Sequence, residues 1–301
     1  MVSTRPTDER RGSTTVGLGT LLRAALPAVP GINLLPGIRK SGGAAGLGAL
    51  AFASEPVTIE RPHVSAYAQV CGFPEKDQVP LTYLHVLGFP MQLQAMADPD
   101  FPFPAIGGVH LTNTITAHRP VAIGETVEVA VRPDNLVPHV KGRTVDFVTE
   151  VSVGDEVVWE GRSTYLRRGP GSADAASGPV FDEVPASGVT WRLPGDLGRR
   201  YAAVSGDRNP IHLYPLTAKA FGFKRQIAHG MWSAARCVAA LENRLPDAVT
   251  VEVAFKKPVF LPGSVAFGSK PTDTGFAFTM ADPHSGAPHV QGRTSPADRP
   301  R

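Results

Sequence analysis

The chain has 301 residues, of which 42% are hydrophobic and 19% are charged, and its formal net charge is +3 with a pI near 8.9. This composition is typical of a globular protein and excludes a largely disordered chain. The charge is only mildly basic and the sequence contains no run of Lys or Arg. We therefore expect an acidic small ligand and exclude a nucleic-acid-binding protein.

Residues 1–54 are predicted to form an N-terminal arm that is partly helical or flexible. Its apolar stretch, VGLGTLLRAALPAVPGINLLPGI, follows a leader that carries both signs of charge, and Arg23 and prolines interrupt it. Such a stretch is too broken to span a bilayer, so we predict no transmembrane segment. We expect it to pack on the rest of the protein, with loose membrane contact as the alternative.

The two cysteines, Cys71 and Cys237, lie among apolar residues and form no CxxC motif. They predict packed, reduced thiols and hence a cytoplasmic protein. The histidines show no ligand spacing and no phosphate-loop or dinucleotide-binding glycine motif is present, so we predict no metal and no cofactor.

A Gly-, Ala- and Ser-rich stretch over residues 167–188 is predicted to be a linker. It separates a half at 55–166 from a half at 189–297. The halves resemble each other: HRPVAIGETVEVAV and KKPVFLPGSVAFGS align when Pro120 is paired with Pro258. Because an internal repeat of this size indicates repeated architecture, we predict two copies of one fold.

Each half contains an apolar helical stretch before strands in which hydrophobic residues alternate. In chain order these are a helix in 81–97, strands in 127–131 and 145–153, a helix in 230–245, and strands in 249–255 and 276–280. A helix that is apolar nearly all round is buried, and period-two alternation is typical of an antiparallel sheet with one covered face. The sequence therefore predicts an α+β fold in which a curved sheet wraps a long helix, twice over.

The stretch YAAVSGDRNPIHLYPLTAKAFGF, from Tyr201, holds the candidate chemistry. Asp207, Asn209 and His212 lie within six residues. One interpretation is a plain turn, since Asp, Asn, Gly and Pro all favour turns. The other is a catalytic pair, because an imidazole and a carboxylate can hold one water and exchange protons with it.

The segment QIAHGMW follows, and Gly230 stands at the expected start of the second helix. A helix N-terminus offers free amide donors, and glycine lets a ligand approach the backbone closely. Such a site suits a carbonyl oxygen that gains negative charge during a reaction. His229 is expected to orient this site or to pack at the helix start, and Ser205 to bind substrate or make a local hydrogen bond.

Together the Tyr–Ser–Gly–Asp–x–Asn–Pro–x–His run and AHGM resemble the MaoC-like, hydratase-2 type of (R)-specific enoyl-thioester hydratases and 3-hydroxyacyl-thioester dehydratases. The two-half layout resembles the double hot-dog members, including actinobacterial fatty-acid dehydratases, in which only the second half keeps the motif. The first half here agrees, because it has Tyr67 but no Gly-Asp-x-Asn-Pro-x-His. The resemblance covers most of the chain from about Glu55.

The resemblance implies that Asp207 and His212 activate the water that adds to a trans-2-enoyl thioester, or that leaves an (R)-3-hydroxyacyl thioester. It implies that the Gly230 amide binds the thioester carbonyl and that Asn209 holds the loop or touches the water. CoA or an acyl-carrier protein would be part of the substrate. A homodimer and contacts with other fatty-acid elongation enzymes are expected partners.

Two alternatives remain open at this point. One is a non-catalytic hot-dog protein that binds acyl thioesters or acts as a scaffold in a lipid-synthesis complex. The other is thioester hydrolysis, for which the second helical stretch offers only Glu242, far from the helix start.

Overall fold

The computed structural model describes residues 10–15, 44–104, 107–176 and 178–297, so the apolar segment of the N-terminal arm lies outside the described residues. The strands are β1 (Arg10–Gly12), β2 (Phe52–Ser54), β3 (Val57–Thr58), β4 (Gly108–Ala117), β5 (Thr126–His139), β6 (Gly142–Val153), β7 (Glu156–Arg168), β8 (Thr190–Leu193), β9 (Val249–Phe255), β10 (Gly263–Pro271), β11 (Phe276–Ala281) and β12 (Pro288–Pro296). The α-helices are α2 (Arg61–Cys71), α3 (Leu84–Ala97), α4 (Leu197–Ser205), α5 (Pro210–Leu213), α6 (Pro215–Ala220) and α7 (Gly230–Ala239), with 3-10 helices η3 (Ala44–Leu50) and η4 (Glu242–Arg244).

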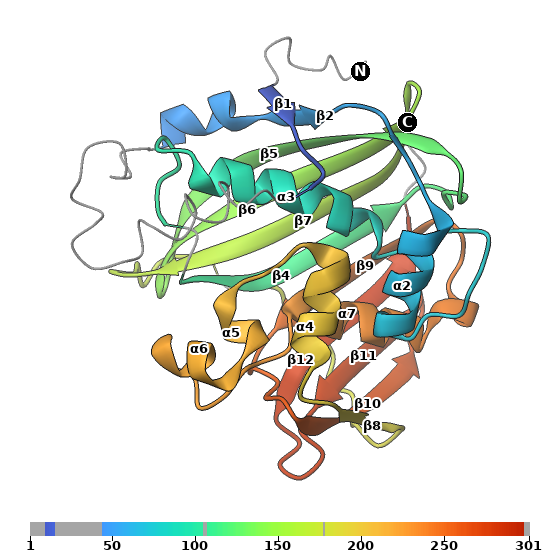
Figure 1. Cartoon of the computed structure of the whole chain (residues 1–301). Helices are drawn as coiled ribbons and strands as arrows, with labels where there is room; N and C mark the ends of the chain where they lie inside the picture. Colours follow the sequence, from blue (N-terminus) through green and yellow to red (C-terminus); the bar gives the residue numbers. More distant parts are fainter. Residues whose placement is uncertain (1–9, 16–43, 105–106, 177, 298–301) are drawn as a thin grey trace.

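One continuous curved sheet runs through both halves, in the order β1-β2-β5-β6-β7-β4-β9-β12-β11-β10-β8, with β3 beside β5. The halves join where β4 pairs antiparallel with β9, from Thr112 opposite Ala254 to Ala117 opposite Val249. The helices lie along one side of this sheet, where α3 packs on β5 and β6 and α7 packs on β11 (Figure 1). The predicted α+β double hot-dog fold is confirmed.

The internal repeat extends to equivalent backbone hydrogen bonds in the two halves. In the first half, the amide of Val79 donates to the carbonyl of Val121 at 2.9 Å. In the second half, the amide of Ala228 donates to the carbonyl of Val259 at 2.8 Å. The residue after Ala228 is the predicted site residue His229, whereas the residue after Val79 is a proline. The first half therefore keeps the scaffold of the site and lacks its chemical groups.

The two central helices bury most of their residues, as the sequence predicts for a helix enclosed by a sheet. The second is shorter than its apolar pattern indicates. The pattern continues to Leu245, but α7 ends at Ala239. The amide of Ala240 is shared among three preceding carbonyls, and the chain then tightens into η4. Apolar spacing alone does not distinguish an α-helix from the tighter turn that follows it.

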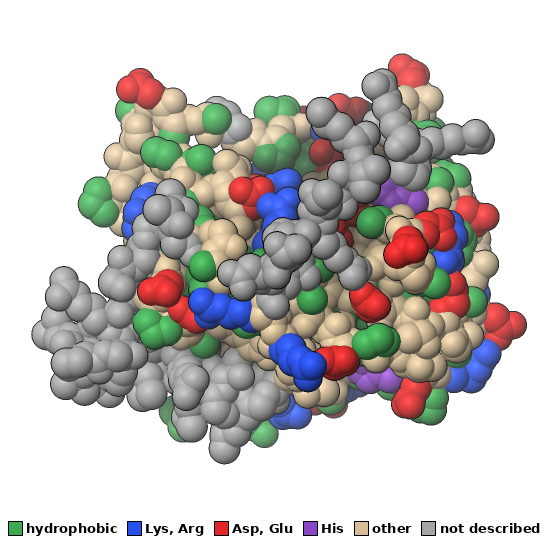
Figure 2. Space-filling model, turned by 90° about the horizontal axis from the view of Figure 1, so that it is seen from above, with side chains coloured by type: hydrophobic (Ala, Val, Ile, Leu, Met, Phe, Trp, Pro, Cys, Tyr) green, Lys and Arg blue, Asp and Glu red, His purple; other side chains and the backbone are tan. Residues whose placement is uncertain are grey.

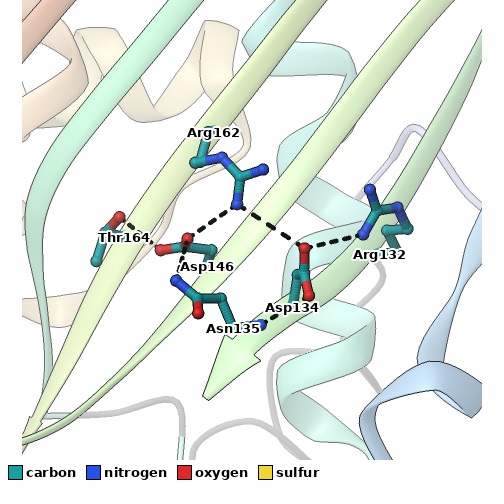
Figure 3. A network of polar contacts seen from close by, with 6 residues as sticks. All are labelled: Arg132, Asp134, Asn135, Asp146, Arg162 and Thr164. Carbon is teal, nitrogen blue, oxygen red and sulfur yellow. Dashed lines mark hydrogen bonds and ion pairs between the residues drawn. The ribbon is translucent and has the colours of Figure 1, made fainter. Parts of the chain in front are cut away.

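The outer face of the first half's sheet carries a polar network on β5, β6 and β7 (Figure 3). The carboxylate of Asp146 accepts hydrogen bonds from Asn135 at 3.1 Å, Arg162 at 2.9 Å and Thr164 at 2.6 Å. Asp134 lies opposite Asp146 across the strands and shares Arg162 with it. Arg162 therefore offsets the repulsion between two facing carboxylates, and the contacts satisfy a carboxylate that is 5% exposed.

The described surface mixes both signs of charge. On the face shown in Figure 2, Lys and Arg side chains are interspersed with Asp and Glu side chains.

Both cysteines are buried free thiols. Within the described ranges, the helices are all too short or too polar to cross a bilayer. The boundaries drawn from the sequence at 54, 166 and 188 stay predictions; β2 of the predicted arm joins the sheet beside β5.

Candidate active site

The loop after α4 is set by short-range hydrogen bonds. Gly206 ends the helix with a left-handed φ of 73°, and its amide donates to the carbonyl of Ala202. This conformation favours glycine and turns the chain out of the helix. The hydroxyl of Ser205 then accepts from the amide of Asp207 at 3.2 Å, and the Asp207 carboxylate accepts from the amide of Asn209 at 3.1 Å. The Asp207 side chain is thereby held in one orientation.

Asn209 caps the short helix α5. Its side-chain oxygen accepts from the amide of Ile211 at 3.4 Å, and Pro210 occupies the first helical position, which needs no amide donor. This cap positions His212 three residues later. The segment is therefore a turn, and this turn presents the two residues of the candidate catalytic pair, whose catalytic role stays a prediction.

His212 is 8% exposed, and its Nδ1 lies 2.8 Å from the carbonyl oxygen of Ile227. A carbonyl only accepts, so Nδ1 carries the proton and Nε2 is the acceptor in the neutral ring. Burial lowers the pKa of His212, and the Asp207 carboxylate and the Ile227 contact act in the opposite direction. A neutral imidazole with a free Nε2 can act as a general base.

His229 packs directly behind this pair. Its Nε2 donates to the backbone carbonyl of Asp207 at 3.0 Å and lies 3.8 Å from that residue's carboxylate. Its ring stacks on His212 with centroids 3.7 Å apart. Burial lowers the pKa of His229 well below its ordinary value, and His212 lowers it further. The neutral ring therefore contacts both catalytic candidates, and the role predicted for it at the carbonyl site stays a prediction.

Gly230 is the first residue of α7, so its amide has no acceptor within the helix and lies at the positive end of the helix dipole. A Cβ at this position would lie 3.2 Å from the ring of Phe255, closer than ordinary contacts. A larger residue here would therefore press on Phe255, which also lines the cavity. The predicted oxyanion donor and the Asp207–His212 pair line the same cavity.

That cavity has a volume of about 540 Å³, within the range of small-molecule sites, and both halves of the chain form it. All six predicted site residues line it: Ser205, Asp207, Asn209, His212, His229 and Gly230. The structure adds residues of the first half that the sequence analysis missed: His85, Val86, Phe89, Leu93 and Met96 of α3, His110 of β4 and Tyr165 of β7. Lys256 and Lys257 also line the cavity, and both are exposed.

Four histidines of this cavity, here called the inner histidines, are His85, His110, His212 and His229. Burial lowers the pKa of His85 to about 4, against an opposing effect of the Asp207 carboxylate. Burial lowers the pKa of His110 to about 3, and His85 lowers it further. All four rings are therefore neutral near pH 7.

Asp207, His212 and His229 also offer three possible metal-ligand atoms within 4.8 Å of one another. Two of the imidazole nitrogens are engaged, since His212 Nδ1 faces the Ile227 carbonyl and His229 Nε2 faces the Asp207 carbonyl. The remaining His229 nitrogen, Nδ1, is buried and has no hydrogen-bond partner among the described residues. The hydrogen bonds thus favour an acid–base pair at this position, and the absence of a metal stays a prediction.

Comparison with known proteins identifies the family. The chain is 40% identical over 280 residues to "3-hydroxyacyl-thioester dehydratase X" of Mycobacterium tuberculosis, which covers 91% of this chain and 96% of that protein. The chain belongs to the MaoC-like dehydratases. The MaoC-like domain itself matches residues 181–274, the part that contains the loop and the start of α7. A shorter match, 38% identical over 69 residues, links it to the "(R)-specific enoyl-CoA hydratase" of Aeromonas caviae, covering 22% of this chain and 52% of that protein.

Solved structures of MaoC-like proteins agree with this assignment. The crystal structure of HtdX from Mycobacterium tuberculosis, 40% identical in sequence, superposes with a TM-score of 0.73 and covers 82% of this chain and 99% of that one. A MaoC-like dehydratase from Phytophthora capsici, 21% identical, gives a TM-score of 0.69 over 84% of this chain and 98% of its own, which shows the common fold.

Proposed function

We propose that this MaoC-like protein is a hydro-lyase that catalyses the reversible hydration of trans-2-enoyl thioesters to (R)-3-hydroxyacyl thioesters in fatty-acid metabolism. The observation that carries the proposal is that a carboxylate, an imidazole with a free Nε2 and a helix-terminal amide open into one cavity: Asp207, His212 and Gly230. The 40% identical relative, a 3-hydroxyacyl-thioester dehydratase by name, supports it.

In the hydration direction, the pair of Asp207 and His212 holds one water. His212 Nε2 accepts a proton from the water as its oxygen bonds to C3 of the substrate. A proton is then returned to C2 on the same face, which restores the pair. Negative charge that gathers on the thioester oxygen is stabilised by the amide of Gly230. The thioester itself acidifies C2, so the step requires no further group; a positioned acid or base typically contributes about 10²–10⁴ in rate.

Two alternative functions have less support from the site. Glu242, the carboxylate considered for hydrolysis, lies in η4 beyond the end of α7, bonded to Lys76 at 3.0 Å, and does not line the cavity. A non-catalytic binding protein would not need a half-buried carboxylate and a buried imidazole held side by side by capping hydrogen bonds. The expected homodimer, elongation-enzyme contacts and cytoplasmic location remain predictions.

We further propose that the phosphates of the thioester carrier lie at the cavity rim, where Lys256 and Lys257 are exposed. The segment from Arg208 to Leu241 adds cations and no acidic residue. This charge suits CoA and suits the phosphopantetheine arm of an acidic carrier protein equally.

The test is the loss of conjugated-thioester absorbance with trans-2-enoyl substrates of short and long chain, on CoA and on acyl-carrier protein. We expect turnover with at least one carrier. Replacing both Lys256 and Lys257 by serine should raise KM for that carrier and weaken its salt dependence, while kcat is retained. Lys224→Ser, at an exposed lysine outside the cavity lining, is the control. No turnover on either carrier would refute the proposed function.

A further inference from the structure

One wall of the cavity is a single face of α3, from the half that lacks the catalytic motif. His85, Phe89, Leu93 and Met96 follow one another at spacings of four, four and three residues, which places them on one side of a helix. From His85 to Met96 this face is about 16 Å long. Beyond its first residue it is apolar, as a channel for an alkyl chain requires.

His85 is the exception on this face. Its side chain is 4% exposed and makes no hydrogen bond with any described residue; its only ring contact there is with Phe89, with centroids 6.2 Å apart. The neutral imidazole holds one N–H donor and one acceptor, and because His85 lines the cavity these two groups can meet a ligand there. A leucine, such as the one found at position 93, would serve a purely alkyl channel better. The wall therefore keeps a donor and an acceptor for whatever fills the cavity.

The position of His85 indicates which group that is. α3 packs against α4, whose C-terminal end leads into Asp207, and the charge of Asp207 acts on the His85 ring. His85 thus lies where the cavity wall changes from the polar groups of the second half to the apolar face of α3. On a 3-hydroxyacyl thioester, the oxygen on C3 lies at the same boundary, between the thioester and the alkyl tail.

We propose that His85 is a substrate-binding residue whose imidazole hydrogen-bonds to the C3 oxygen and so selects 3-hydroxyacyl thioesters over unsubstituted acyl thioesters. In the hydration direction the same imidazole hydrogen-bonds to the incoming water that Asp207 and His212 hold. This inference rests on the proposed function. It assigns to the half without the motif a direct part in recognising the reacting carbon.

The test measures binding without turnover, in protein that carries Asp207→Asn. Isothermal titration with (R)-3-hydroxydodecanoyl-CoA and with dodecanoyl-CoA gives the preference for the hydroxyl. Adding His85→Leu should weaken binding of the hydroxyacyl thioester about three- to tenfold, the effect of one neutral hydrogen bond, and leave dodecanoyl-CoA bound equally or more tightly. Adding His85→Gln instead, which keeps a donor and an acceptor, should restore part of the preference.

Leu93→Ala in the same background is the matched control, since it alters the same helix face two turns away. It should weaken the binding of both thioesters by the same factor and leave the preference for the hydroxyacyl thioester unchanged. The inference is overturned when His85→Leu and His85→Gln, both folded by their melting curves, leave the preference unchanged. Failure of the wild-type protein to hydrate any enoyl thioester would overturn the proposed function, and this inference with it. An active wild type with an unchanged preference would overturn the inference alone.

Discussion

Gly198→Ala should inactivate the site without changing any side chain that lines the cavity. Gly198 lies in α4, directly against the backbone of His212. An added Cβ would lie 1.9 Å from the carbonyl oxygen of His212 and 2.9 Å from its carbonyl carbon. Ordinary contacts begin near 3.4 Å, so α5 and its histidine must move by about 1.5 Å. A misplacement of about 1 Å can cost about 10²-fold in rate, and overpacking costs about 1–3 kcal/mol of stability.

The assay is kcat/KM for enoyl-thioester hydration, measured together with a thermal melt. We expect a loss of at least about 10²-fold, with a protein that still folds. Gly195→Ala is the control, since its Cβ would lie 3.6 Å from the side chain of Pro262, an ordinary contact. A Gly198→Ala protein with wild-type kcat/KM would refute the argument that the position of His212 sets the rate.

Three further predictions follow from the same contacts. The inner histidines are neutral in the folded protein but have an ordinary pKa near 6.5 when unfolded. The unfolded state therefore binds more protons, and the free energy of unfolding should fall as pH drops from about 6.5 to 5, by up to about 1.4 kcal/mol per pH unit per histidine. Urea unfolding at several pH values checks this, and a flat profile would contradict it. Because His212 must be neutral to accept a proton and its pKa is lowered, kcat/KM for hydration should stay level above pH 6.5 and decline only below it; a decline that begins above pH 7 would oppose this assignment. Finally, Asp146→Ala should lower the free energy of unfolding by about 1–3 kcal/mol, since it removes three hydrogen bonds to a buried carboxylate, yet retain kcat/KM because Asp146 lies on the outer face of the sheet. Asp134→Ala, at a more exposed carboxylate, should lower the free energy of unfolding by less. Equal losses in the two variants would show that burial of the carboxylate does not set the loss of stability.

The sequence was sufficient to predict the site residues that come from the second half of the chain, because the geometry of this segment is local. The Gly-Asp-x-Asn-Pro-x-His run encodes its own helix end, cap and turn, so Asp207, Asn209 and His212 lie close together whatever surrounds them. The contribution of α3 was not predictable in this way. Its residues are apolar nearly all round, so the pattern favours no face, and His85 belongs to no motif.

Only the tertiary structure places α3 at the site. The pairing of β4 with β9 joins the two sheets edge to edge and brings α3 beside α4. His110 reaches the cavity for the same reason, from β4, where it stacks on Tyr165 and lies tilted against Phe255. Contacts between residues far apart in sequence depend on this strand order, which single-sequence periodicity does not specify. The spacing within β4 carried no signal that could have identified His110.

The central claim is that Asp207 and His212 activate a water for addition to an enoyl thioester. The most direct measurement is the rate of hydration by the wild-type protein and by Asp207→Asn, with the chirality of the product determined. The account predicts an (R)-3-hydroxyacyl product and a loss of kcat of at least about 10²-fold in a variant with an unchanged melting temperature. A folded Asp207→Asn protein that keeps the wild-type rate, or an (S) product, would contradict it.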